Sequence, residues 1–156
     1  MRTHIPFDAR DPKSRLSPVL DPAERESFAH AMLADVLAAL EPTPLEPTVV
    51  TTDPLAYDLP VPVRIDDRPL DPLVNDAIQA DTPVAVAMAD LPLAEPGDLV
   101  GLLETAGDVV LVPGRGGGTN AMVVRDDAFQ VDYHGVSIRD HQAIAAERGL
   151  SLATFD

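Results

Sequence analysis

The stretch at residues 83–90, PVAVAMAD, decides the fold class that we predict for this chain. It is apolar from Pro83 to Ala89 and stops at a carboxylate, Asp90. A short apolar run with no polar interruption is typical of a strand buried on both faces of a parallel sheet. We therefore expect Asp90 at the carboxyl end of a buried strand, which is where α/β proteins bind their ligands.

The segments around this strand alternate between helical and extended patterns. Residues 22–40 carry apolar side chains at helical spacing, behind a predicted N-cap, Asp21, with Pro22 at the first helical position and Glu24 three residues after the cap. The other predicted helices and strands are 70–80, 96–105 and 138–148, and 3–7, 48–51, 61–65, 108–112, 120–124 and 152–155. This alternation predicts an α/β fold, a mainly parallel sheet with helices on both faces, formed by residues 1–156 as a single domain.

The charge of the chain is strongly negative. Its 26 acidic and 11 basic residues give a formal net charge of −15, and Lys13 is the only lysine. Because such self-repulsion is relieved when salt screens it, we expect a halophilic protein adapted to a salty cytoplasm; an acidic mesophilic protein is the alternative. Nucleic-acid binding, which needs clustered positive charge, is not expected.

The absence of cysteine, of an N-terminal signal pattern and of a long apolar segment favours the cytoplasm and no membrane partner.

Two stretches offer charged groups for phosphate chemistry. Lys13 and Arg15, in the early loop DPKSRL, have the charges to bind phosphates, although two solvated surface cations are the alternative. Asp90 is a candidate ligand for Mg²⁺, which prefers carboxylate and phosphate oxygens, and its alternative is the N-cap of the following segment.

Two further stretches offer backbone donors and hydroxyl groups. Gly116, Gly117 and Gly118, in VPGRGGGTN, let the backbone approach an anion, although a hairpin turn explains the same residues. Gly135 and Ser137 precede a predicted helix, where a serine either caps the helix or helps to bind an anion.

The two histidines of this last segment do not predict a metal centre. His134 and His141 lie seven positions apart, and we expect them to share no close acidic partner. A zinc site is therefore not expected.

Taken together, these stretches resemble one family, the 2-phospho-L-lactate guanylyltransferases of coenzyme F-420 biosynthesis. The resemblance runs in the family's order through IPFDARDPKSRLSPVLDPAER, AMLADVL, LVNDAI, AVAMADLPL, VPGRGGGTNAMVV and YHGVSIRDHQAIAAERG. It implies a Rossmann-like nucleotide-diphospho-sugar transferase fold. The implied reaction joins GTP and 2-phospho-L-lactate to give lactyl-2-diphospho-5′-guanosine and pyrophosphate, with Mg²⁺ as cofactor and a homodimer as the assembly.

The resemblance also implies roles for single residues. Lys13 and Arg15 would lie near the triphosphate with the glycine loop, Asn75 would lie in the nucleotide pocket, and Asp90 would hold the metal ion. The acid substrate would be bound by Thr119, Gly135 and Ser137, although the spacing around Gly135 differs slightly from the family's usual pattern.

One departure from the family keeps alternatives open. Members normally continue past this point through a strand with a second acidic motif of the D-x-D kind, whereas this sequence stops at Asp156. We therefore expect either a partial sequence or a shortened relative, in which the source of a second metal ligand is open. The alternatives to the family's reaction are a related nucleotidyltransferase using phosphoenolpyruvate or phosphoglycerate, and a non-catalytic nucleotide-binding or oligomerisation module.

Overall fold

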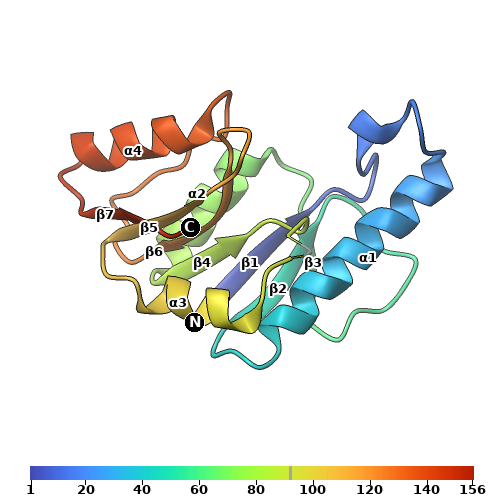
Figure 1. The fold of residues 1–156 in the computed structure, drawn as a ribbon, viewed down its shortest axis with the longest axis horizontal. Helices are drawn as coiled ribbons and strands as arrows, with labels where there is room; N and C mark the ends of the chain where they lie inside the picture. Colours follow the sequence, from blue (N-terminus) through green and yellow to red (C-terminus); the bar gives the residue numbers. More distant parts are fainter. Residues whose placement is uncertain (92) are drawn as a thin grey trace.

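The structure, a computed structural model, describes residues 1–91 and 93–156; Pro92, in the stretch AVAMADLPL, lies outside the described residues. The described residues form a seven-stranded sheet in the order β3-β2-β1-β4-β6-β5-β7 (Figure 1). The strands are β1 (Arg2–Phe7), β2 (Glu46–Thr51), β3 (Val63–Ile65), β4 (Val84–Ala87), β5 (Val109–Pro113), β6 (Thr119–Val124) and β7 (Leu152–Thr154). The helices are η1 (Ser14–Leu16, a 3-10 turn), α1 (Pro22–Leu40), α2 (Leu70–Asp81), α3 (Pro96–Glu104) and α4 (Ser137–Glu147).

The sheet is mostly parallel, as the sequence predicts, with one reversed strand. β1 runs parallel to β2 and to β4, β2 runs parallel to β3, and β5 runs parallel to β7. β6 is antiparallel to both of its neighbours, β4 and β5. The α/β fold class is therefore confirmed, and the central hairpin of β5 and β6 makes the sheet mixed.

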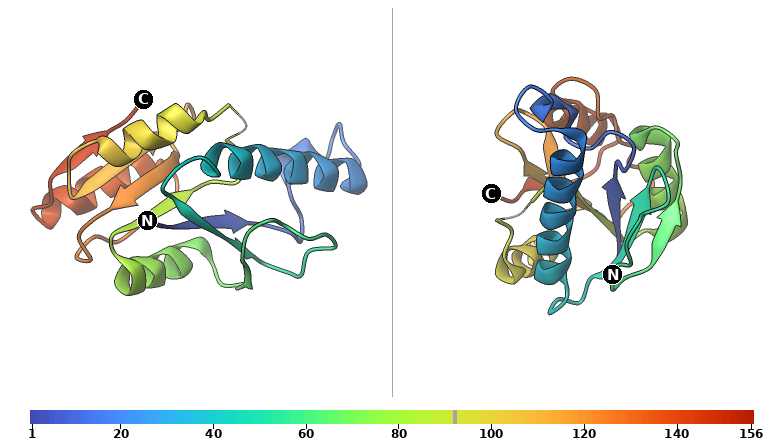
Figure 2. Two further views of the ribbon diagram at one scale, coloured as in Figure 1. Left: turned by 90° about the horizontal axis from the view of Figure 1, so that it is seen from below. Right: turned by 90° about the vertical axis from the view of Figure 1, so that its right-hand side faces the viewer.

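Helices cover both faces of this sheet (Figure 2). α1 and α3 pack on one face, over a core that includes Ile5, Leu33 and Val123. α2 and α4 pack on the other, over a core that includes Val74, Met122 and Phe129. All residues of β4 are buried, because the strand lies between these two layers. This burial explains the apolar run that the sequence shows at this strand.

The first helix is determined by its local sequence. Asp21 accepts a hydrogen bond from the backbone N–H of Glu24, and the Glu24 carboxylate accepts one from the N–H of Asp21, both at 2.8 Å. This is the predicted capping box, with Pro22 at the first helical position, and the helix runs from Pro22 to Leu40 as expected. Among the described residues, no helix combines the length and the apolar character needed to cross a bilayer.

Candidate active site

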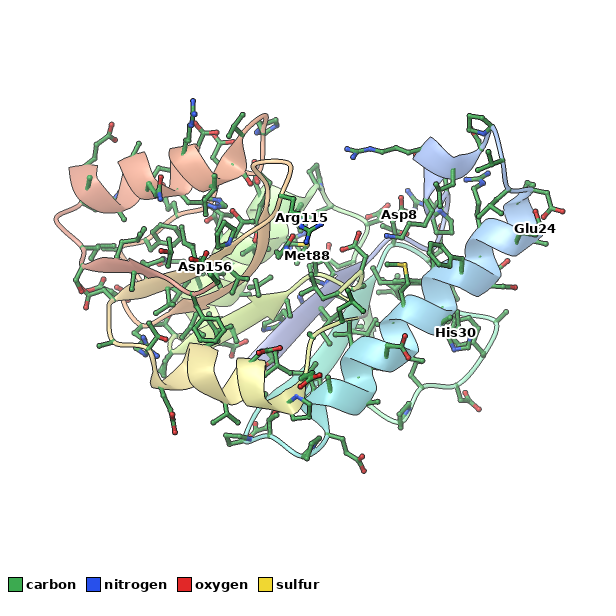
Figure 3. All side chains as sticks on the ribbon, in the orientation of Figure 1. Asp8, Glu24, His30, Met88, Arg115 and Asp156 are labelled. Atoms are coloured by element: carbon green, nitrogen blue, oxygen red, sulfur yellow. The ribbon has the colours of Figure 1, made fainter. Side chains whose placement is uncertain are left out.

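The strand directions bring several loops to one edge of the sheet. The carboxyl ends of β1, β4 and β5 meet there, and because β6 is antiparallel, its first residue, Thr119, lies at the same edge. The Met88 N–H donates to the carbonyl oxygen of Asn120 at 2.9 Å, which joins the end of β4 to the start of β6. Figure 3 shows Arg115 and Met88 near the middle of the view, with Asp8 between them and α1.

Lys13 and Asp90 meet at this edge. The Lys13 ammonium Nζ donates to Asp90 Oδ2 at 2.7 Å. Their side chains are 23% and 50% exposed, so solvent reaches both partners. Both line a cavity of about 200 Å³, together with Asp8 and the apolar side chains of Phe7 and Met88. The cavity therefore combines a cation, two carboxylates and an apolar wall.

The backbone of Lys13 is held in a special conformation. Its φ of 53° lies in the left-handed region, where a residue with a side chain is uncommon. Residues held in this region cluster at functional sites. Arg15, two residues further along η1, is exposed, and among the described residues it has no ion-pair partner. The structure thus brings Lys13 to Asp90 and leaves Arg15 at the surface.

The cavity also contains a carboxylate that the sequence reasoning did not single out. Asp8 Oδ1 accepts hydrogen bonds from the N–H groups of Arg10 and Asp11 and from the Thr52 hydroxyl, at 3.0, 3.4 and 3.3 Å. This turn fixes the carboxyl group at the end of β1. Its signal in the sequence was an aspartate directly after the first predicted strand.

The glycine loop is the hairpin turn between β5 and β6. The Gly114 N–H donates to the Gly118 carbonyl at 2.8 Å, and the Gly117 N–H donates to the Gly114 carbonyl at 2.9 Å. Gly117 has a φ of +82°, and a Cβ at that position would lie 2.8 Å from Val136 Cγ1. A Cβ on Gly116 or Gly118 would have no heavy atom within 4 Å. The hairpin alternative therefore accounts for the requirement at Gly117, while the other two glycines border open space.

The same loop contains a second residue that the sequence reasoning missed. Arg115 is exposed at the turn and, within the described part of the chain, forms no ion pair. A cation inside a glycine-rich turn was the available signal.

Thr119 and Ser137 lie together, as the resemblance implies, but under α4 rather than in the cavity of Lys13. Thr119 Oγ1 lies 3.2 Å from Ser137 Oγ and 2.9 Å from His141 Nδ1. The register of β5 and β6 shifts between Val112 and Pro113, which pairs with Thr119. Irregularities of this kind redirect a side chain. Gly135, two residues before Ser137, has a φ of +57° and is exposed.

Asn75 has a structural contact on the α2 side of the sheet. Its Oδ1 accepts a hydrogen bond from the N–H of Val131 at 2.8 Å. Asp71, one turn earlier, accepts from the N–H of Tyr133 at 2.9 Å. These two side chains anchor the connection from β6 to α4. Among the described residues, Asn75 is not part of the lining of the cavity of Lys13 and Asp90.

His134 has two carboxylate partners that the sequence reasoning did not single out. Its Nδ1 lies 2.8 Å from Asp132 Oδ1 and 3.2 Å from Asp71 Oδ2. The hydrogen bond to Asp132 and its negative charge raise the pKa of His134. The ligand atoms of Asp71, Asp132 and His134 all lie within 4.8 Å of one another. The tertiary structure creates this cluster, because Asp71 comes from α2, far from the histidine in sequence.

The fold is that of nucleotide-diphospho-sugar transferase-like proteins. A protein from Desulfovibrio desulfuricans G20, provisionally named a nucleotide-diphospho-sugar transferase, superposes with a TM-score of 0.76 and 15% identity, over 98% of this chain and 78% of its own. A hypothetical transferase from Thermus thermophilus has a TM-score of 0.59 at 15% identity, over 99% of this chain and 92% of its own.

The sequence comparisons point to one family within this fold. The family model described as Guanylyl transferase CofC like matches residues 1–156, and the chain belongs to this family. Similar curated proteins, each named 2-phospho-L-lactate guanylyltransferase, come from Halomicrobium mukohataei (55% identity over all of this chain and 76% of the relative) and Natronomonas pharaonis (51% over 97% and 74%). A third, from Haloarcula marismortui, is 49% identical over all of this chain and 76% of its own length. The chain thus spans about three quarters of these relatives' length.

Proposed function

We propose that this protein is a 2-phospho-L-lactate guanylyltransferase. A phosphate oxygen of the acid bonds to the α-phosphorus of GTP, the bond from that phosphorus to the bridging oxygen breaks, and pyrophosphate leaves with the electron pair. The product is lactyl-2-diphospho-5′-guanosine. The identity of about half of all positions with relatives that carry this name supports the assignment of substrates.

The observation that carries the proposal is the contact between Lys13 and Asp90. Two reactants that are both anions repel each other, so the site must supply positive charge and hold the reacting atoms in line. A phosphate nucleophile is already ionised at neutral pH and needs no general base. The single lysine of the chain, 2.7 Å from a carboxylate in a cavity at the carboxyl edge, suits this task.

We assign the remaining groups as follows. Lys13, with Arg15 and the N–H groups of Gly116 and Gly118, binds the triphosphate. Thr119, Ser137 and the backbone at Gly135 bind the acid. Arg115 is added to the triphosphate side because it is an exposed cation in the same loop. The side-chain oxygen of Asn75 already accepts a hydrogen bond from Val131, so we assign the contact with the nucleotide to its side-chain NH₂ group.

The cavity fits a divalent cation. Asp90 is half exposed, Asp8 is in the same lining, and carboxylates with phosphate oxygens are the ligands that Mg²⁺ prefers. We propose that Asp90, with Asp8 as the second carboxylate, holds Mg²⁺, which when bound would neutralise charge on the phosphates. Lys13 must leave Asp90 for this, and the triphosphate offers its ammonium a new partner.

The test is an assay of pyrophosphate release with GTP and Mg²⁺ in about 1 M KCl, where the Debye length falls to about 3 Å. 2-Phospho-L-lactate, phosphoenolpyruvate and 3-phosphoglycerate are offered one at a time. We expect release with 2-phospho-L-lactate. Release with another acid alone would identify a related transferase, and GTP binding without release from any acid would identify a non-catalytic module.

The assembly and the location in the cell are further parts of the proposal. We propose a homodimer in the cytoplasm. Light scattering in the same molar KCl would measure the mass, and a mass of one chain, 16.6 kDa, would contradict the dimer.

A further inference from the structure

A buried histidine lies directly behind the two hydroxyl groups that we assign to the acid substrate. Ser137 and His141 are four residues apart on α4 and therefore on the same side of the helix. His141 Nδ1 lies 2.9 Å from Thr119 Oγ1, which in turn lies 3.2 Å from Ser137 Oγ. The exposed fractions of the three residues are 5% for Thr119, 3% for Ser137 and 0% for His141. The ring can therefore reach bound substrate only through the hydroxyl groups.

The rest of the imidazole ring is enclosed by apolar and aromatic groups. Tyr133 and Phe129 meet it edge to face, with ring centroids 5.0 and 5.9 Å away. Nε2 has no hydrogen-bond partner among the described residues. Burial lowers the pKa of His141, although the negative charges of Asp132, Asp71 and Asp140 oppose this shift. The ring is therefore neutral near pH 7 and carries a single proton on one of its nitrogens.

The surroundings determine which nitrogen carries that proton. A proton on Nε2 would leave a buried N–H donor without an acceptor, and such orphaned donors are rare in proteins. A proton on Nδ1 donates to Thr119 Oγ1 and leaves only a lone pair unpaired at Nε2. We therefore assign the Nδ1–H tautomer to His141.

This tautomer determines where the hydrogens of the two hydroxyl groups point. Once Thr119 Oγ1 accepts from His141, its own hydrogen must point away from the ring, toward Ser137 or a ligand. Ser137 can then accept from Thr119 and direct its hydrogen outward from the first turn of α4. In the other tautomer, Thr119 would donate its hydroxyl hydrogen to the unprotonated Nδ1. The acid would then face a lone pair of Thr119 Oγ1, which repels an anion.

We propose that His141 is a positioning residue for the acid substrate, because it orients the hydroxyl hydrogens of Thr119 and Ser137 toward the bound anion. The inference rests on the proposed function, which assigns these hydroxyl groups to the acid. Packing alone does not explain the histidine, because a buried polar ring with one unpaired nitrogen is less favourable there than an aliphatic side chain.

The kinetic test compares three substitutions. His141→Leu removes the donor, His141→Asn keeps an N–H donor close to the position of Nδ1, and His141→Gln moves the donor toward the position of Nε2. Because the Thr119 hydroxyl loses the donor that turns its hydrogen toward the anion, we expect His141→Leu to raise the KM for 2-phospho-L-lactate by about tenfold or more, with the KM for GTP within about twofold. His141→Asn should restore most of the loss, and His141→Gln should not.

The matched control is His30→Asn. His30 stacks on Tyr57 with centroids 3.7 Å apart, at α1, and the substitution should leave both KM values unchanged. An unchanged acid KM in folded His141→Leu overturns the inference. If that variant does not fold, the other two decide, and equal acid KM values for His141→Asn and His141→Gln overturn it.

A second measurement tests the tautomer directly. The ring nitrogens of His141 in the ¹⁵N-labelled protein, assigned by their loss in His141→Asn, should show a protonated Nδ1 and an unprotonated Nε2 near neutral pH. A protonated Nε2 overturns the inference even in an active enzyme. If the wild-type protein releases no pyrophosphate with any acid, the proposed function fails instead, and the tautomer measurement still reports on His141.

Discussion

Lys13 Nζ and Asp90 Oδ2 lie 2.7 Å apart, although the two residues are separated by 77 positions in the sequence. The lysine comes from the loop after β1 and the aspartate from the loop after β4, which are adjacent parallel strands. Their contact pairs the single lysine of the chain with the carboxylate that we propose as a metal ligand.

Replacing Asp90 by asparagine should abolish Mg²⁺-dependent pyrophosphate release. The amide keeps the shape of the side chain but loses the charge that attracts the cation, and we expect kcat/KM to fall by about 100-fold or more. Asp35→Asn, on the exposed side of α1, makes the same charge change away from the cavity and is the control. Unchanged turnover in the Asp90 variant would remove this residue from the metal site.

Replacing Lys13 by alanine should have opposite effects on metal binding and on turnover. Without nucleotide, Lys13 competes with Mg²⁺ for Asp90, and because this pair is partly exposed, its removal should strengthen Mg²⁺ binding only about two- to fivefold. Turnover should fall, because the triphosphate loses a cation. Calorimetric titration of the nucleotide-free protein with Mg²⁺ measures the first effect, and Lys13→Arg, which keeps the charge, should not show it. Weaker Mg²⁺ binding in Lys13→Ala would contradict the competition.

Gly117→Ala should destabilise the hairpin beside α4, whereas Gly116→Ala should not. Gly117 has a φ of +82° and no room for a Cβ beside Val136, while Gly116 borders open space. A residue with a side chain in the left-handed region costs about 1–2 kcal/mol, before the clash is counted. Urea unfolding of both variants measures the difference. Equal free energies of unfolding would show that the loop adapts to the side chain.

The buried His141 should make the protein less stable in acid. Its pKa in the folded chain is below its ordinary value of 6.5, so the unfolded chain binds the proton at a higher pH. The free energy of unfolding therefore falls as the pH drops below about 6.5. The pKa of His134 is raised, so its protonation changes the free energy of unfolding in the opposite direction. The contribution of His141 is therefore measured by comparing the wild-type protein with His141→Leu. Urea unfolding at about pH 7.5 and 5.5 should show a smaller loss of stability in the variant; an equal loss would contradict the shift.

Salt should stabilise the chain strongly. A net charge of −15 spread over 156 residues repels itself, and the Debye length falls from about 10 Å at 0.1 M salt to about 3 Å at 1 M. We expect the Tm to rise through this range of KCl. A Tm that does not rise would contradict the halophilic assignment and favour an acidic mesophilic protein.

The local sequence was sufficient to predict the helices and strands, but not the direction of every strand in the sheet. The helix from Pro22 to Leu40 was predicted with its cap, because capping and periodicity act within a few residues of each other. The apolar run at β4 predicted a buried strand for the same reason. The direction of β6 was not predictable from periodicity, since a short apolar strand has the same pattern whether its partners are parallel or antiparallel.

By itself, the sequence determined the fold class, the family and a set of candidate residues that included Lys13, Asp90 and Thr119. Only the tertiary structure paired Lys13 with Asp90, tied Asn75 to the backbone of Val131 and gave His134 two carboxylates. It also placed His141 behind Thr119, and Asp8 in the lining of the same cavity as Asp90. The physical reason is that these contacts depend on strand order and register. Both are decided by how the whole core packs, and no local stretch of the chain contains that information.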